Sequence, residues 1–217
     1  TASGGPFLNL KMSQFKNIKP KDALKHPKWK MGKKITVDSS TLMNKLFEII
    51  EAQKLFNVPI NKLDVLIHPD SLVHAIVKFK NGLSRFIYHE TSMIIPLSNA
   101  IFGENIEIKK FLPNKFKKKT TIKNLIFENV KTNIFPVYKI KKKLAEYPST
   151  PIIINAANEI LVDQFLQKNI PFLGISRNIL KILNDRNYKK YAIKRPKNIN
   201  EIIKIDNWAR NNIIKKL

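Results

Sequence analysis

An amphipathic helix is the clearest element that the hydrophobic pattern predicts. Between residues 39 and 51, apolar positions recur at helical spacing and form one stripe, made of Leu42, Met43, Leu46, Ile49 and Ile50. Ser39 and Ser40 precede the stripe and have the side chains that favour a helix N-cap. The opposite face is polar and carries Asn44, Glu48 and Glu51, flanked by Lys45. The pattern therefore predicts one buried and one solvated helix face.

A basic loop that contains a glycine precedes this helix, from His26 to Lys34. A helix N-terminus presents unpaired N–H groups and partial positive charge, so serine hydroxyls and Lys45 near it favour a phosphate site. The carboxylate of Glu48, one turn further on, is able to hold a metal, and the loop is placed to act as a lid. An ordinary capped surface helix fits the same periodicity. The helix alone leaves both interpretations open.

Strand patterns follow the helix. Residues 64–67 are predicted to form a strand, and residues 72–79 and 83–88 are predicted to pair as a hairpin through Asn81-Gly82, a strong hairpin signal. A helix with an apolar face next to a sheet indicates an α/β or α+β domain. We expect this catalytic domain, with a mixed sheet, to span residues 1–102.

The remainder of the chain changes character twice. Residues 103–145 contain lysine blocks between apolar residues, which is typical of a connecting segment with solvated faces. Residues 152–166, 175–183 and 198–217 have helical patterns with polar connections. We expect a linker over residues 103–145 and an all-α C-terminal helical bundle over residues 146–217.

The chain of 217 residues is strongly basic, with a formal net charge of +24. A basic nucleic-acid-binding protein is therefore an alternative function. However, 35 of the 40 basic residues are lysines spread along the chain, whereas base recognition favours arginine. Scattered lysine is more typical of a solvated surface, and no nucleic-acid-binding module is evident. The chain also lacks cysteine, which excludes a thiolate nucleophile and cysteine metal ligands.

Two further properties bear on location and completeness. No apolar run approaches the roughly 18 residues that span a bilayer, so we expect no membrane partner. The chain starts with Thr1-Ala2-Ser3-Gly4-Gly5 and has no initiator Met or signal pattern, which predicts that these residues come from inside a longer protein. His68 and His74 lack a metal-ligand spacing and are interpreted as structural histidines.

Several separated motifs occur along the chain. They are Ser3-Gly4-Gly5-Pro6-Phe7, His26-Pro27-x-Trp29-x-Met31-Gly32-x-Lys34-Ile35, Val37-Asp38-Ser39, Asn44-Lys45-x-x-Glu48, Ile67-His68-Pro69 and Asn155-Ala156-Ala157-Asn158-Glu159. Together they resemble one enzyme family, 1-deoxy-D-xylulose 5-phosphate reductoisomerase. Their order along the whole chain makes the resemblance specific. It implies an NADPH-dependent enzyme that rearranges the carbon skeleton of 1-deoxy-D-xylulose 5-phosphate. Reduction of the resulting aldehyde would then give 2-C-methyl-D-erythritol 4-phosphate, in non-mevalonate isoprenoid precursor synthesis.

The resemblance also implies roles for individual residues. The substrate, chiefly its phosphate, would be bound by Ser3, His26, Ser39, Asn44 and Lys45. Glu48 would ligate Mg²⁺ or Mn²⁺ and contact substrate hydroxyls, and Glu48, His26 and Lys45 would be the catalytic residues. Trp29 and Met31 would lie on the lid, and Met31, Gly32 and Met93 near the NADPH nicotinamide. A hard carboxylate oxygen suits either metal.

Parts of the family pattern are missing from this sequence. The Rossmann-like NADPH-binding domain and the Asp-x-Glu metal ligands of the family precede the Ser-Gly-Gly motif. We therefore expect this chain alone to be inactive and to work with an upstream NADPH-binding domain of the same protein. The resemblance further implies a homodimer. The Lys, Ile and Asn bias resembles the version from malaria-type parasites, which implies the stroma of a plastid, the apicoplast.

Overall fold

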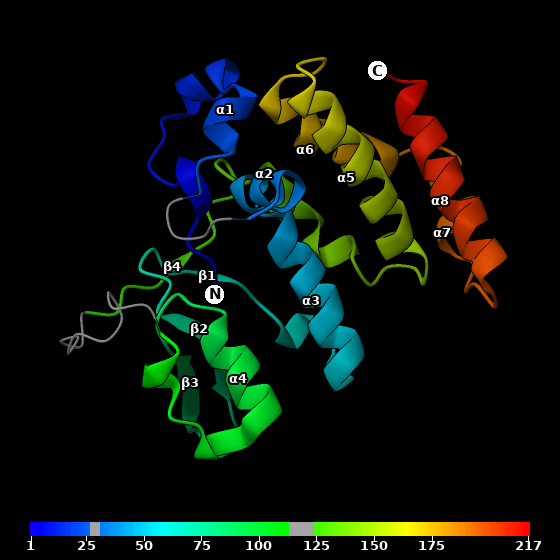
Figure 1. Cartoon of the computed structure of the whole chain (residues 1–217). Coiled ribbons are helices and arrows are strands. Elements are labelled where there is room, and N and C mark those ends of the chain that lie inside the picture. The colour runs from blue at the N-terminus through cyan, green and yellow to red at the C-terminus, as the bar shows by residue number, and fades with distance from the viewer. Residues whose placement is uncertain (27–30, 113–123) are drawn as a thin grey trace. The chain divides into compact units, whose positions relative to one another are not determined.

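The computed structural model describes residues 1–26, 31–112 and 124–217, and within these ranges the chain is mostly helical (Figure 1). The α-helices are α1 Pro20–Ala23, α2 Lys33–Thr41, α3 Met43–Phe56, α4 Ile94–Phe102, α5 Thr150–Leu166, α6 Phe172–Ile182, α7 Tyr188–Ala192 and α8 Ile199–Ile214. The strands are β1 Leu66–Ile67, β2 Val73–Lys78, β3 Ser84–Tyr88 and β4 Glu128–Asn129. Short 3-10 helices are Gly5–Phe7, Met12–Asn17, Ile60–Lys62, Gly103–Asn105, Ile108–Lys110 and Pro136–Lys143.

Two compact units divide the chain, and neither is continuous in sequence. Unit 1 combines Thr1–Ser3 with Leu66–Asn129, and unit 2 combines Gly4–Val65 with Val130–Leu217. The segment predicted as a linker, residues 103–145, contributes β4 to unit 1 and the 3-10 helix Pro136–Lys143 to unit 2. The domain boundaries at residues 102 and 145 stay predictions.

Unit 1 contains the predicted hairpin. Strands β2 and β3 pair antiparallel, and Gly82 adopts a φ of 88° in the turn between them. A second small sheet pairs β1 with β4 antiparallel, and Ala2 forms a parallel bridge to Ile67 on β1. The expected mixed sheet therefore exists, within the described ranges, only as this two-stranded sheet with one parallel bridge. Helix α4 was not predicted, because its apolar residues 94–102 show no stripe that distinguishes a helix from a buried strand.

Unit 2 is helical and is built around α5. The faces of α5 that are buried in unit 2 contact α2, α6 and α8, and Figure 1 shows α8 running beside α5. Fully buried aliphatic side chains such as Ile153, Leu161 and Ile175 fill this core. Four phenylalanines, Phe7, Phe15, Phe165 and Phe172, lie with ring centroids 5.0–6.2 Å apart and attach the N-terminal 3-10 helices to α5 and α6. The helices predicted for the C-terminal part are confirmed.

The predicted helix over residues 39–51 is two helices instead of one. Helix α2 already begins at Lys33, and Leu42, with a φ of 71°, separates it from α3. Ser39 and Ser40 are therefore in the last turn of α2 and are not the N-cap. The hydroxyl groups explain the break: Ser40 Oγ donates to the Val37 carbonyl at 2.7 Å, and Thr41 Oγ1 to the Asp38 carbonyl at 3.1 Å. Such side-chain bonds compete with the helical hydrogen bonds.

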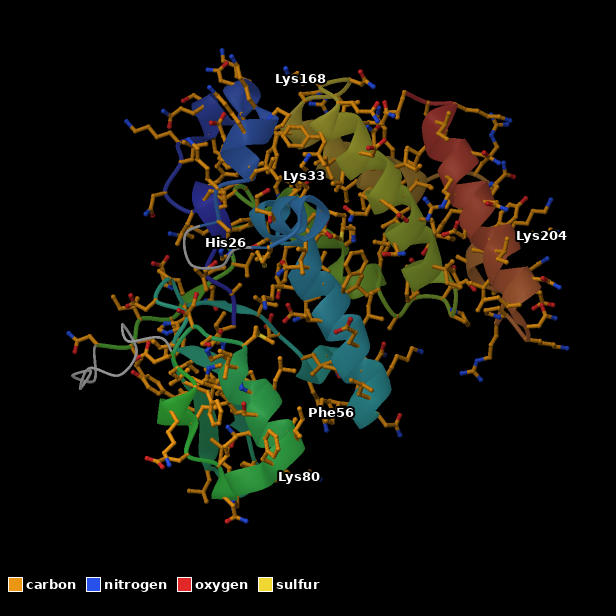
Figure 2. All side chains as sticks on the ribbon, in the orientation of Figure 1. His26, Lys33, Phe56, Lys80, Lys168 and Lys204 are labelled. Atoms are coloured by element: carbon orange, nitrogen blue, oxygen red, sulfur yellow. The ribbon has the colours of Figure 1, made fainter. Side chains whose placement is uncertain are left out.

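Lysine side chains point into solvent from many elements of the described chain. Figure 2 labels Lys33, Lys80, Lys168 and Lys204, all of which are exposed. They come from α2, the β2–β3 turn, the residues after α5, and α8. This distribution agrees with the predicted solvated surface. None of the helices within the described ranges has both the length and the apolar character that crossing a bilayer requires.

Candidate functional site

The first turn and a half of α3 brings three of the predicted site residues together. On α3, the side chains of Met43, Leu46 and Ile49 are buried in the core. Asn44, Lys45 and Glu48 lie on the other side of the helix. Lys45 Nζ lies 2.7 Å from Glu48 Oε1 and 2.6 Å from Oε2. Lys45 is largely covered, with 20% of its side chain exposed, whereas 51% of Glu48 is exposed. A cation and a carboxylate are thus adjacent at the start of a helix.

His26 belongs to the same neighbourhood. Partial burial lowers the pKa of its imidazole below the ordinary value of 6.5, and the positive charge of Lys45 lowers it further. The charge of Lys45 therefore acts on His26, although 19 positions separate the two residues in sequence. At neutral pH the ring is therefore uncharged, and it can accept or donate one hydrogen bond at each nitrogen.

Asn44 carries an unsatisfied polar atom. Its Oδ1 is buried and has no hydrogen-bond partner within the described residues. A buried amide oxygen without a donor is costly, on the order of 1–3 kcal/mol. Such an atom, next to Lys45 at the start of a helix, is what a bound hydroxyl donor would satisfy.

Ser39 lies at the end of α2, close to the Ser-Gly-Gly turn. A Cβ on Gly5 would meet the Ser39 carbonyl oxygen at 3.1 Å and Ser40 Cα at 3.2 Å, and Gly5 has a φ of 62°. Gly4 also has a positive φ of 85°. Glycine tolerates such positive φ values because it has no Cβ. Gly5 packs directly against the backbone of α2. A residue with a side chain would not fit there without a shift of that backbone.

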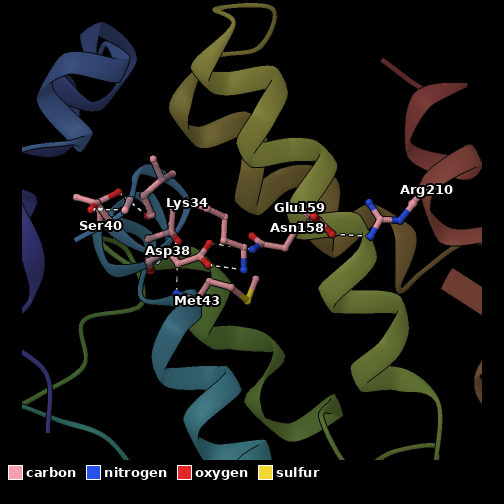
Figure 3. A network of polar contacts seen from close by, with 11 residues as sticks. Lys34, Asp38, Ser40, Met43, Asn158, Glu159 and Arg210 are labelled. Carbon is pink, nitrogen blue, oxygen red and sulfur yellow. Dashed lines mark hydrogen bonds and ion pairs between the residues drawn. The ribbon is translucent and has the colours of Figure 1, made fainter. Parts of the chain in front are cut away.

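Asp38 is a residue with a structural role that sequence reasoning missed. It is almost fully buried at 2% exposure, and its Oδ1 accepts a hydrogen bond of 2.8 Å from Nδ2 of Asn158 on α5. Its Oδ2 forms an ion pair of 2.7 Å with Lys34, one turn earlier on α2 (Figure 3). Burial raises the pKa of the Asp38 carboxyl, and the hydrogen bonds from Asn158 and Lys34 and the Lys34 charge oppose that rise.

Glu159, the neighbour of Asn158, points to a different helix. Its carboxylate pairs with Arg210 on α8 at 2.5 Å (Figure 3). Arg210 also pairs with Asp206 on its own helix at 2.6 Å. Within the Asn-Ala-Ala-Asn-Glu motif, Asn158 therefore connects α5 to α2, and Glu159 connects α5 to α8. The signal available in the sequence was the i, i+4 spacing of Lys34 and Asp38 and a buried position for Asn158 on a helix.

The other predicted site residues lie elsewhere or outside the described residues. Met31 is half-buried, and Gly32 is the exposed N-cap residue of α2. Ser3 and Met93 belong to unit 1, and the Met93 side chain is 55% exposed. Trp29 lies outside the described residues. The roles of all these residues stay predictions.

The two histidines interpreted as structural make hydrogen bonds within unit 1. His68 Nδ1 lies 2.8 Å from the Ile126 carbonyl, and the ring stacks on Phe127. His74 Nε2 lies 3.1 Å from the His89 carbonyl, and the two imidazoles stack with centroids 3.7 Å apart. His68 Nε2, however, is buried without a partner in the described part of the chain, so His68 is only partly satisfied.

Metal ligands are sparse in this chain. Within the described ranges, no group of three or more His, Cys, Asp or Glu side chains could enclose a metal ion. Glu48 fits a hard divalent cation, because it offers an exposed carboxylate at the rim of the site. It can supply one ligand.

Lys45, the orphaned amide oxygen of Asn44 and the exposed carboxylate of Glu48 lie together at the start of α3, an arrangement that is able to bind an anionic, hydroxyl-bearing ligand. Family models show which family the chain belongs to. Residues 1–56 match the 1-deoxy-D-xylulose 5-phosphate reductoisomerase C-terminal domain, and residues 90–212 match the DXP reductoisomerase C-terminal domain. The chain belongs to the 1-deoxy-D-xylulose 5-phosphate reductoisomerase family.

Individual relatives agree with this membership. The chain is 47% identical over 210 residues to the reductoisomerase of Pelagibacter ubique, covering 96% of this chain and 53% of that protein. It is 44% identical over 194 residues to that of a Sulfurihydrogenibium species, covering 88% of this chain and 50% of that protein. The chain thus spans about half the length of the curated relatives it matches. Both organisms are bacteria, so these relatives do not support the expected plastid location.

Solved structures show the same fold. A crystal structure of DOX-P reductoisomerase in complex with NADPH, fosmidomycin and magnesium matches 99% of this chain and 53% of its own, with a TM-score of 0.88 and 29% identity. The Zymomonas mobilis enzyme in complex with NADPH matches 99% of this chain and 54% of its own, with a TM-score of 0.79 and 29% identity. The chain therefore has the fold of this part of the family.

Proposed function

We propose that this chain is the substrate-binding and C-terminal portion of an NADPH-dependent reductoisomerase that converts 1-deoxy-D-xylulose 5-phosphate to 2-C-methyl-D-erythritol 4-phosphate. The observation that carries the proposal is the cluster of Asn44, Lys45 and Glu48 at the start of α3, in a chain that belongs to this family. Family membership favours this enzyme over the nucleic-acid-binding alternative that the net charge suggested.

The phosphate would be bound at the N-terminus of α3. Lys45 supplies the positive charge, and the first N–H groups of α3 supply partial positive charge beside it. Helix α3 begins at Met43, so its first turn is Met43–Leu46. The helix that would bind the anion therefore begins three residues after Ser40, where the sequence pattern had predicted its N-terminus. His26, uncharged at neutral pH because of burial and Lys45, would contribute a hydrogen bond rather than a second charge.

The substrate hydroxyls would be held by groups next to the phosphate. The orphaned Oδ1 of Asn44 can accept from one of them. Ser39, at the end of α2, and Ser3 would add hydroxyl contacts, as the family resemblance implies. Held in this way, the substrate is fixed at both its phosphate and its carbon chain, which lowers the entropic cost of reaching the reactive geometry.

Glu48 would be one ligand of a divalent Mg²⁺ or Mn²⁺ ion, together with the Asp-x-Glu pair that the family carries upstream of the Ser-Gly-Gly motif. When bound, the ion supplies Lewis-acid polarisation of the substrate carbonyl, and NADPH supplies the hydride that reduces the aldehyde. Both Glu48 oxygens accept from Lys45, and the half-exposed carboxylate keeps lone pairs that could ligate the ion beside this contact. A similar protein was crystallised in complex with NADPH, fosmidomycin and magnesium, which supports the proposal of NADPH and a divalent metal ion for this chain.

The lid and most of the cofactor contacts are proposed for the segment that leads into α2, and Met93, before α4, is proposed as a further cofactor contact. Trp29 and Met31 would close over the substrate and exclude water, and Met31, Gly32 and Met93 would lie near the nicotinamide. The exposed N-cap position of Gly32 supports this, since a Cβ added there would meet no atom within 4 Å and the backbone is open to a ligand.

The partners would be an upstream NADPH-binding domain of the same protein and a second copy of the chain. All five residues of β3 are exposed, and α4 exposes Leu97, Ile101 and Phe102. An isolated two-stranded hairpin is marginally stable in water, and a large exposed apolar surface marks a contact region. This surface of unit 1 supports a homodimer. A plastid location, by resemblance to the parasite enzyme, stays a prediction.

The test is an enzyme assembled by fusing this chain behind the N-terminal half of the Pelagibacter ubique relative. We expect NADPH oxidation that requires both 1-deoxy-D-xylulose 5-phosphate and Mg²⁺, and none from the unfused chain. Glu48→Gln should lower kcat at least about 100-fold, because losing one metal ligand removes transition-state stabilisation of several kcal/mol.

Glu51→Gln is the matched control. Glu51 lies on the same exposed face of α3, one turn further from the helix start, and has no proposed role. Its turnover should stay within about twofold of the parent enzyme. Equal turnover for Glu48→Gln and the parent would refute the role of Glu48, and a fused, folded enzyme without NADPH oxidation would refute the proposed function.

A further inference from the structure

The hydrogen bond between Asp38 and Asn158 joins α5 to α2, directly before α3, the helix of the proposed phosphate site. Asp38 takes part through two different groups. Its side chain accepts the hydrogen bond from Asn158 on α5, and its backbone carbonyl accepts one from Thr41 Oγ1 at 3.1 Å. Thr41 Oγ1 in turn accepts a hydrogen bond of 3.3 Å from the backbone N–H of Met43. A chain of hydrogen bonds therefore runs from α5 through α2 to the first residue of α3.

This chain of bonds spans the break between the two helices. Leu42 adopts a left-handed conformation there, which costs a non-glycine residue about 1 kcal/mol and persists only where neighbouring contacts hold it. Asn44 and Lys45 directly follow Met43, and Ser39 directly follows Asp38. Any rotation of the last turn of α2 therefore changes where the first turn of α3 points, and with it the donors of the proposed phosphate site.

Burying the Asp38–Asn158 pair costs folding stability. Both residues are at most 2% exposed, and Asn158 Oδ1 has no partner within the described residues. A well-packed apolar pair at such a position is often as stable as a buried polar one. This cost in stability is explained if the pair fixes a geometry that the function needs, which is a common use of buried polar contacts at functional sites.

We propose that Asn158 is a positioning residue for substrate binding: through Asp38 it sets the α2–α3 junction and thereby aims Asn44 and Lys45 at the substrate phosphate. This inference rests on the proposed function. Asn158 touches neither the substrate nor the ion in this account and acts through Asp38. Glu159, its neighbour on α5, pairs with Arg210 on α8, and within the described residues this contact does not reach the junction.

The test is a double-mutant cycle on phosphate binding, with inorganic phosphate as the probe and the full 217-residue chain. Asn158→Asp keeps the shape of the side chain but places two carboxylates together, and Asp38→Asn removes the charge that Asn158 recognises. Combining both changes restores an amide–carboxylate pair in reversed order, near Lys34. We expect each single variant to weaken phosphate binding by about tenfold and the combination to return it to within about threefold of the parent.

Glu159→Gln is the control, because it removes an ion pair from the adjacent position of the same helix and should leave phosphate binding within about twofold of the parent. Binding is measured by calorimetry at a temperature where circular dichroism shows parental helix content. If one single variant does not fold, the other single variant and the combination decide the outcome.

Two results separate the failures. If the folded single variants bind phosphate as the parent does, or the combination restores nothing, the positioning role of Asn158 is overturned while the phosphate site stands. If the folded parent chain binds no phosphate, the phosphate site of the proposed function fails, and the inference fails with it.

Discussion

The polar residues of α2 and those of α3 differ in almost every physical respect. On α2, Thr36, Asp38, Ser40 and Thr41 are buried, and each has a side-chain hydrogen bond inside unit 2. On α3, Glu48 is half exposed, and Asn44 has an unsatisfied amide oxygen. The polar groups of α2 are therefore paired within the protein, whereas Glu48 and Asn44 on α3 remain available to a ligand.

This difference teaches which residues to assign to chemistry and which to geometry. Buried, satisfied polar groups stabilise one arrangement of the backbone, because breaking them leaves desolvated partners. Exposed groups contribute little to stability and can exchange partners when a ligand binds, and a buried unsatisfied group costs stability until a ligand pairs with it. In this chain the two sets are only a few residues apart in sequence, and the left-handed Leu42 separates them.

The largest effect should come from removing the buried carboxylate. Asp38→Ala leaves Asn158 without its acceptor and should lower the free energy of unfolding by about 2–3 kcal/mol. Lys45→Ala removes a surface ion pair and should lower it by at most about 1 kcal/mol. Urea unfolding followed by circular dichroism measures both. Equal losses for the two variants would contradict the division between geometry and ligand binding.

A second buried polar contact should govern the alkaline limit of stability. Burial raises the pKa of Tyr188 to about 12, and its hydroxyl lies 2.6 Å from Thr150 Oγ1. The tyrosine of the unfolded chain loses its proton first as the pH rises, so stability should fall between pH 10 and about 12. Tyr188→Phe should make this fall shallower and cost about 1 kcal/mol at pH 7. An unchanged slope in thermal unfolding across this range would refute the assignment.

The smallest effect concerns the exposed set. The charge of Lys45 contributes to the lowered pKa of His26, after burial. Lys45→Ala should therefore raise the His26 pKa. Titration of the ring protons by NMR measures this. A His26 pKa that does not respond to the substitution would mean that the two side chains do not share one site.

Much of the fold could be predicted from the sequence. The Asn81-Gly82 hairpin, the C-terminal helices and the apolar stripe of α3 follow from local patterns, because periodicity and turn chemistry act over a few residues. The start of α2 at Lys33 could not be predicted, since the buried face of α2 is polar and gives no hydrophobic period. The same polarity made Ser39 and Ser40 resemble an N-cap.

The candidate site was predictable only where its residues are adjacent in sequence. Asn44, Lys45 and Glu48 share one helix turn and a half, so their spacing brought them together in advance. The bond between Asp38 and Asn158 joins positions 120 residues apart, and only the packing of α5 against α2 places them in contact. Tertiary pairs of this kind leave no periodic signal in one sequence.

Binding of Mn²⁺ to the assembled enzyme tests the central claim, that Glu48 on α3 is a metal ligand, most directly. Electron paramagnetic resonance of free Mn²⁺ reports binding without turnover, in the parent and in the Glu48→Gln and Glu51→Gln variants. We predict that Glu48→Gln weakens Mn²⁺ binding at least about tenfold and that Glu51→Gln leaves it unchanged. Equal Mn²⁺ affinity in the parent and in folded Glu48→Gln would contradict the claim.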